Sequence, residues 1–130
     1  MELHRGRLFD HVHLHASDLE ATKRFYVAVL DVLGIPHNSA PDHFWADELW
    51  IDAGEGTRVH FAFQAKDRET VDRFHAAALA AGGRDNGAPG ERAYHPGYYA
   101  AFVFDPDGNN IEAVYHGEAE RSSPSVTIRF

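Results

Sequence analysis

Residues 104–116 read FDPDGNNIEAVYH, a pattern typical of a strand end, a tight turn and a second strand. In the DPDG turn at 105–108, proline fixes one φ angle and glycine supplies the positive φ that a short hairpin needs. The strand that follows, 110–115, is mostly apolar but carries one carboxylate, Glu112. Side chains alternate along a strand, so Glu112 shares a face with Asn110. A single carboxylate in this setting is a first candidate for chemistry.

Composition limits the classes of function. The chain has 130 residues, the size of one domain or of two small halves that share a core. Its formal net charge of −8 disfavours a phosphate-binding surface, so we expect no nucleic-acid partner. The absence of cysteine excludes disulfides and thiolate metal sites. No apolar run reaches membrane-spanning length and no signal peptide is evident, so we expect a cytoplasmic protein without a membrane partner. Ten histidines indicate metal or proton chemistry.

Two stretches, 8–16 and 57–65, alternate between apolar and polar residues and predict strands. Their polar faces carry His11, His13 and His15 in the first strand and His60 and Gln64 in the second. Each strand precedes a predicted helix. Ser17 is expected to cap the first helix, which ends at Gly34, and Asp67 to cap the second. Residues 85–96, rich in glycine and proline, predict a long loop with at most one short strand, and 126–130 either adds an edge strand or stays loose.

The two halves of the chain repeat each other. A shift of 49 residues, the interval from His11 to His60, aligns identical residues without a gap. The other matched pairs are Asp18 with Asp67, Arg24 with Arg73, Phe25 with Phe74, Ala28 with Ala77, Leu30 with Leu79 and Gly34 with Gly83. Several identities at one offset indicate an internal repeat, and each half reads as strand, helix and about three strands.

The segments DHVHLHASDLEATKRFY, VHFAFQAKDRETVDRFHAAALAAGG and YYAAFVFDPDGNNIEAVYH make this chain resemble the vicinal oxygen chelate superfamily of glyoxalases, extradiol dioxygenases and bleomycin-resistance proteins. The resemblance implies an α+β fold. Two repeated βαβββ modules would form a curved sheet around a metal-binding cavity, with the helices outside. It implies one domain over 1–130, with module one at about 8–56, module two at about 57–116 and a C-terminal tail at 117–130.

The resemblance also implies a metal site. In the superfamily, the first strand of each module and the last strand of the second supply ligands, which here are His11, His60 and Glu112. Two imidazoles and a carboxylate suit a divalent Fe, Mn, Ni or Zn ion. All three residues lie on the less apolar face of a predicted strand. The alternative for each histidine is an ordinary solvent-facing residue on an amphipathic strand.

Further residues are candidates around that site. Glu48 is a candidate fourth ligand, and a surface glutamate at a strand start is the alternative. His13 could be a base or a substrate contact, or a polar residue that lines the cavity. Tyr99 is a candidate for binding an oxyanion through its hydroxyl. Residues that could line a pocket are Trp50, Gln64, His95, Tyr98 and Asn110.

The resemblance implies a metal-dependent enzyme that acts on a small oxygen-rich substrate chelating the metal. Its reaction would be that of a glyoxalase-like lyase or isomerase, or of an extradiol-type dioxygenase. The alternative is a non-catalytic protein that binds a small molecule, of the bleomycin-resistance kind, although such relatives usually lack the ligand set. A homodimer is expected on the same grounds, with the site built either within one chain or across two.

Overall fold

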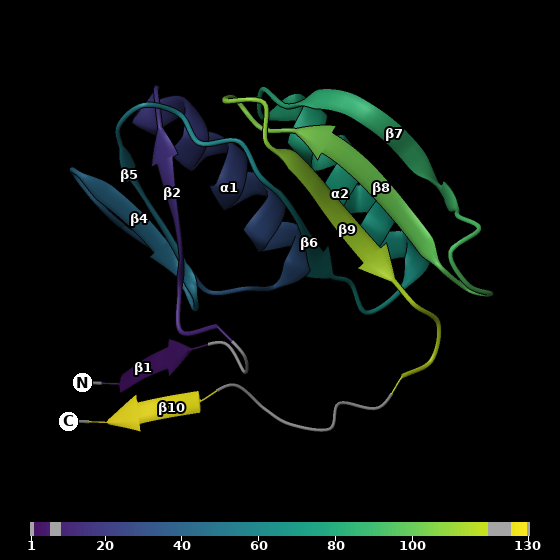
Figure 1. The fold of residues 1–130 in the computed structure, drawn as a ribbon. Helices are drawn as coiled ribbons and strands as arrows, with labels where there is room; N and C mark the ends of the chain where they lie inside the picture. The colour runs from purple at the N-terminus through teal and green to yellow at the C-terminus, as the bar shows by residue number, and fades with distance from the viewer. Residues whose placement is uncertain (1, 6–8, 120–125, 130) are drawn as a thin grey trace.

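The computed structural model describes residues 2–5, 9–119 and 126–129 of the chain, and Figure 1 shows its helices and strands. In chain order they are β1 (Glu2–Arg5), β2 (Val12–Ala16), α1 (Leu19–Leu33), β3 (Asn38–Ala40), β4 (His43–Ala46), β5 (Leu49–Ala53), β6 (His60–Gln64), α2 (Arg68–Ala80), β7 (Arg84–Glu91), β8 (Tyr99–Phe104), β9 (Asn110–Tyr115) and β10 (Val126–Arg129). Neither helix of the described part is long and apolar enough to cross a membrane.

Two βαβββ modules follow one another. The first forms a sheet in the order β2-β5-β4-β3, and the second forms a sheet in the order β6-β9-β8-β7. In each sheet the first and last strands of the module pair in parallel, and the other neighbours are antiparallel. The predicted α+β class and repeated modules are therefore confirmed, but the two sheets stay separate and do not close. Outside the modules, β1 and β10 pair antiparallel in a two-stranded sheet of their own.

The repeat extends to the helix caps. The side chain of Asp18 accepts a hydrogen bond of 3.1 Å from the backbone N–H of Ala21 and caps α1. Asp67 accepts one of 2.7 Å from the N–H of Thr70 and caps α2, as predicted. The prediction that Ser17 caps α1 was wrong, because its hydroxyl donates instead to the carboxylate of Asp107 in the second module.

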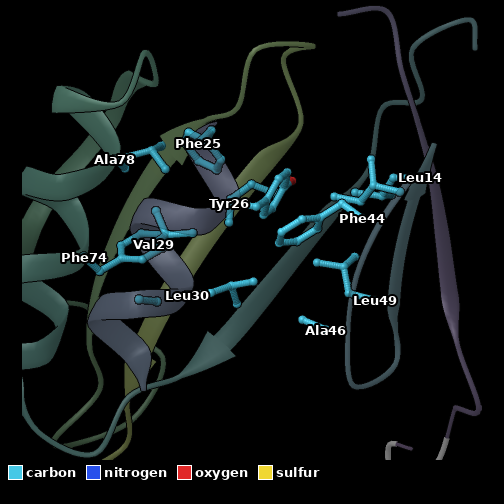
Figure 2. Close-up of a cluster of buried hydrophobic side chains, with 14 of the residues drawn as sticks. Leu14, Phe25, Tyr26, Val29, Leu30, Phe44, Ala46, Leu49, Phe74 and Ala78 are labelled. Carbon is cyan, nitrogen blue, oxygen red and sulfur yellow. The ribbon is translucent and has the colours of Figure 1, made fainter. Parts of the chain in front are cut away.

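The core lies around the two helices. In Figure 2, α1 lies between strands of the first sheet and α2. Its buried Phe25, Tyr26, Val29 and Leu30 join one cluster with Phe74 and Ala78 of α2 and with Leu14, Phe44 and Leu49 of the first sheet. Each helix covers one face of its own module's sheet, since burial alternates along the strands. Neither described helix covers the other face of these sheets, and most of the polar candidates lie there.

The strands β7 and β2 differ most from the prediction. β7 is an eight-residue edge strand where residues 85–96 predicted a loop. Pairing with β8 outweighs the weak strand propensity of glycine and proline, and the register shifts around Gly87 and Gly90 accommodate them. At the other end of the chain, β2 begins at Val12 rather than at residue 8, so His11 precedes the strand.

Candidate metal centre

His60 and Glu112 meet on the uncovered face of the second sheet. Glu112 is only 3% exposed, and its Oε1 lies 3.3 Å from Nε2 of His60. The other ring nitrogen, Nδ1, lies 2.8 Å from the backbone carbonyl oxygen of Asn110. A carbonyl can only accept, so Nδ1 carries the proton of this hydrogen bond. Unless the ring carries a second proton, Nε2 therefore presents a lone pair to a carboxylate oxygen.

Tyr98 occupies the other oxygen of the same carboxylate. Its hydroxyl donates to Oε2 of Glu112. Burial, and next the hydrogen bond to Glu112, raise the pKa of Tyr98 to about 12. The ring of Phe102 is roughly parallel to that of His60, with 6.2 Å between the centroids. Oε1 of Glu112 therefore faces His60, while the hydrogen bond from Tyr98 to Oε2 fixes the orientation of the carboxylate.

The structure corrects the choice between the two tyrosines. The hydroxyl of Tyr99, the predicted substrate contact, donates a hydrogen bond of 2.6 Å to Asp72 of α2. The guanidinium of Arg68 lies 4.7 Å from the centre of its ring. Alternation along the strand places Tyr99 on the helix-covered face of the second sheet and Tyr98 on the uncovered face.

His11 stays apart from the other two predicted ligands in this chain. Its side chain is 59% exposed, and Nδ1 lies 2.8 Å from a carboxylate oxygen of Asp10. Among the described residues, the one group of three His, Asp or Glu side chains whose ligand atoms converge within 4.8 Å does not include His11, His60 or Glu112. The single chain therefore brings together two of the three predicted ligands, and the role of His11 as a metal ligand stays a prediction.

That converging group lies on the uncovered face of the first sheet and consists of His13, His15 and Asp52. Nε2 of His13 and Nδ1 of His15 each lie 2.9 Å from Oδ1 of Asp52. The hydrogen bond from His13 is the main reason why the pKa of Asp52 is lowered. The sequence singled out His13 but not Asp52, which lies 39 residues away along the chain.

The remaining pocket candidates also lie on or beside the uncovered faces. His95 Nε2 lies 2.8 Å from Nδ1 of His116, and both rings meet that of Tyr98 edge-on, with centroids 5.3 and 5.2 Å from that of the tyrosine. Trp50 of the first sheet stacks on His43 at 4.5 Å. Two further candidates belong to the second sheet: Gln64 is exposed, and Asn110 accepts a side-chain hydrogen bond of 3.1 Å from Asn86.

A family model described as "Glyoxalase/Bleomycin resistance protein/Dioxygenase superfamily" matches residues 31–113, more than half of the chain. The chain belongs to this superfamily. A glyoxalase/bleomycin resistance protein from Albidiferax ferrireducens T118 is 32% identical, with a TM-score of 0.73 over 82% of this chain and 97% of that one.

Other solved structures of this superfamily share the fold. A glyoxalase/bleomycin resistance protein/dioxygenase family enzyme from Burkholderia phytofirmans PsJN is 23% identical, with a TM-score of 0.62 over 80% of this chain and 94% of that one. A lactoylglutathione lyase from Agrobacterium tumefaciens is 22% identical, with a TM-score of 0.57 over 80% of this chain and 90% of that one. No curated protein matches the sequence.

Strand register separates Glu48 from Glu112 in this superfamily member. In the first module His13 pairs with Trp50, and in the second module Ala62 pairs with Glu112. The 49-residue shift matches His13 with Ala62, so Trp50, not Glu48, takes the place that corresponds to Glu112. Glu48 lies just before β5, and burial raises its pKa. The role of Glu48 as a fourth metal ligand stays a prediction. The internal repeat does not support it, because Glu48 and Glu112 do not occupy equivalent positions.

Proposed function

We propose that this chain is a metal-dependent enzyme of the glyoxalase or dioxygenase type, acting on a small oxygen-rich substrate that chelates the metal. The observation that carries the proposal is the approach of His60 Nε2 to Glu112 Oε1, 3.3 Å apart, with the carboxylate 3% exposed. Because the second ring nitrogen faces a backbone carbonyl, the two facing lone pairs need a cation or a proton between them.

The donor atoms fit a divalent first-row ion. His60 and Glu112 offer one imidazole nitrogen and one carboxylate oxygen, and the superfamily pattern adds His11 as the third ligand. We therefore propose Fe, Mn, Ni or Zn as the cofactor. When bound, such an ion supplies Lewis-acid polarisation of a substrate oxygen.

Residues around the pair position the reacting groups. The carbonyl of Asn110 fixes the ring of His60, and the hydroxyl of Tyr98 fixes the carboxylate of Glu112. With a pKa of about 12, Tyr98 stays protonated at neutral pH and acts as a hydrogen-bond donor rather than as a base. The ring of Phe102 lies beside that of His60, with 6.2 Å between the ring centroids.

A second copy of the chain is part of the proposal. The two sheets do not close around a cavity, and His11 does not join His60 and Glu112 within one chain. In a homodimer, the uncovered face of one chain's second sheet can meet the first sheet of the partner. Such a pairing would bring in the missing ligand and enclose the substrate.

Elemental analysis of tag-free protein tests the metal site. We expect one equivalent of a first-row metal per chain to be lost in His60→Ala and in Glu112→Gln. His75→Gln is the matched control, because His75 also lies 2.9 Å from a carboxylate, that of Asp85, but on α2. Equal metal content in the unsubstituted protein and all three variants would contradict the assignment of His60 and Glu112 as metal ligands. Metal that the unsubstituted protein holds and the His60→Ala and Glu112→Gln variants lose would justify assays with methylglyoxal–glutathione adducts and catechols.

One observation favours a binding protein as the second candidate. His43, Trp45 and Trp50 form a stack on the uncovered face of the first sheet, with centroid separations of 4.5 to 5.9 Å. Aromatic platforms of this kind bind flat organic ligands. If the protein takes up no Fe, Mn, Ni or Zn, tryptophan fluorescence during a screen of planar small molecules becomes the deciding measurement.

A further inference from the structure

His13, His15 and Asp52 form a compact cluster on the first sheet, separate from the His60–Glu112 pair. Their three ligand atoms lie within 4.8 Å of one another, with 2.9 Å from each histidine nitrogen to Oδ1 of Asp52. We propose that these residues form a second metal site, which binds an imidazole-preferring divalent ion such as Zn²⁺ within a single chain.

The cluster is held on rigid strands. β2 and β5 pair in parallel, with His15 directly opposite Asp52 and His13 two pairs earlier, on the same face. The backbone N–H of His15 donates a hydrogen bond of 3.3 Å to Oγ1 of Thr57. Ligands on paired strands keep their separation better than ligands on loops, so the ion would need little reorganisation of the backbone.

Gly54 makes room for the ring of His15. A Cβ atom at Gly54 would lie 3.0 Å from Nδ1 and 3.2 Å from Cγ of that ring. Any larger residue at this position would crowd the imidazole, which would have to shift by a few tenths of an ångström. The strand end is therefore shaped to let one ligand approach the carboxylate through Nδ1.

The donor set indicates which ions the cluster would take. Two imidazole nitrogens and one carboxylate oxygen suit Zn²⁺, Ni²⁺ or Co²⁺, whereas Mg²⁺ and Ca²⁺ prefer sites made of oxygen. Without an ion, both histidines direct their hydrogen bonds at the same oxygen. An ion between them would replace both protons and contact all three groups. The side chains are 33 to 44% exposed, so coordination positions stay open to solvent or to an oxygen-bearing ligand.

The site does not follow from the internal repeat. The residues of the second module that correspond to His13, His15 and Asp52 are Ala62, Gln64 and Val114, by the 49-residue shift and the strand register. At the same three places the second sheet therefore has alanine, glutamine and valine, which do not serve here as metal ligands. The strand geometry thus tolerates replacement of the three cluster residues.

This assignment competes with one predicted role of His13. If Nε2 of His13 binds an ion, the same nitrogen cannot accept a proton during catalysis. If His13 serves as a base, Asp52 orients it and no ion is needed. Metal binding by a protein that lacks the His60–Glu112 pair separates the two roles.

Equilibrium dialysis against Zn²⁺ tests the site in the His60→Ala/Glu112→Gln background. We expect this protein to retain one Zn²⁺ per chain. Adding His15→Gln or Asp52→Asn should weaken binding by about 100-fold or more, because even lost partners of metal ligands cost about 10- to 100-fold. With Co²⁺ in place of Zn²⁺, the visible absorption of the bound ion should disappear in the same two variants.

His75→Gln in the same background is the control and should bind Zn²⁺ unchanged. Circular dichroism and the urea midpoint show whether each variant is folded, and Asp52→Asn preserves the shape of the side chain. Failure of the background protein to retain Zn²⁺ overturns the proposal. So does Zn²⁺ binding that both added substitutions leave unchanged, or that the control abolishes. None of these results depends on whether the His60–Glu112 site binds metal.

Discussion

The hydroxyl of Tyr26 donates a hydrogen bond of 2.7 Å to the carboxylate of Asp105, and both side chains are buried. Tyr26 lies on α1 of the first module, and Asp105 begins the turn between β8 and β9 of the second. Asp105 also accepts from the backbone N–H of Asn109 at 2.9 Å and from its side-chain amide at 2.8 Å. One carboxylate therefore shapes the turn that precedes Glu112 and joins it to the other module.

Replacing Tyr26 with phenylalanine should lower the free energy of unfolding by about 1–3 kcal/mol, because a buried carboxylate oxygen loses one donor. Burial, and next Asp105, hold the pKa of Tyr26 well above its usual value. The contribution of a group with a raised pKa is complete below its unfolded value and falls only above it. Urea unfolding should therefore show the same loss at about pH 7 and about pH 9.

Tyr94→Phe is the control for this substitution, because Tyr94 is 73% exposed. Its effect should stay within about 0.5 kcal/mol. Equal losses in the two variants would show that the contact with Asp105 contributes nothing specific.

The internal repeat predicted more of the fold than local patterns did. Asp18 and Asp67 align at the 49-residue shift, and both cap helices. The capping-box pattern pointed to Ser17 instead, because a local motif cannot show that Ser17 has a partner 90 residues away. Alternation placed His60 and Glu112 each on the less apolar face of its own strand, and the pairing of β6 with β9 brings these two faces together. His60 and Glu112 lie close together because the first and last strands of the module pair in parallel. The repeat alone does not predict this pairing, which follows from the family resemblance.

Register was the part that the sequence could not supply. Module one is shorter between its first and last strands than module two, so the 49-residue shift stops applying after the helix. Local pattern made Glu48 a candidate fourth ligand, whereas the paired strands put Trp50 at the place that corresponds to Glu112. The same missing register hid Asp52 as the partner of His13. For Tyr98 and Tyr99, alternation showed that the two differ in face but not which one faces the helix.

Titration of Tyr98 should report its contact with Glu112. Because the pKa of Tyr98 is raised to about 12, its contribution to the free energy of unfolding is complete below about pH 10. That contribution is lost as the pH rises towards 12. Glu112→Gln should lower this pKa, because the carboxylate's hydrogen bond and charge both favour the neutral phenol. Burial should still keep the value above 10.

The ultraviolet absorbance of tyrosinate, with Tyr98→Phe as the reference that lacks this group, measures the shift. A tyrosine that titrates identically with Glu112 and with Gln at position 112 would mean that the hydroxyl and the carboxylate are not in contact in solution.

Tyr98→Phe should weaken metal binding at the His60–Glu112 site by about 10- to 100-fold, since it frees the carboxylate oxygen that the phenol holds. Competition with a chromophoric chelator measures the change. Tyr99→Phe is a matched control, because its hydroxyl donates to Asp72 on the other face of the sheet. The same loss in both variants would assign the effect to packing rather than to the orientation of Glu112.

Mixed dimers should show whether the metal site spans two chains. Neither the His11→Ala variant alone nor the Glu112→Gln variant alone should bind metal at the His60–Glu112 site, because each lacks a proposed ligand of that site. If His11 of one chain completes the His60–Glu112 pair of its partner, a dimer of the two variants contains one intact site and one site with both defects. If each site uses one chain only, the mixed dimer contains no intact site.

We expect metal content to rise above that of both parents after the two variants are mixed, partly unfolded and refolded together, because the separate sheets and the isolated His11 favour a shared site. Full recovery corresponds to one ion per mixed dimer. Other metal sites are the same in every sample and cancel in the comparison. Light scattering fixes the oligomeric state, and a mass-tagged chain shows how much mixed dimer has formed. Abundant mixed dimers without any gain of metal would confine the site to one chain.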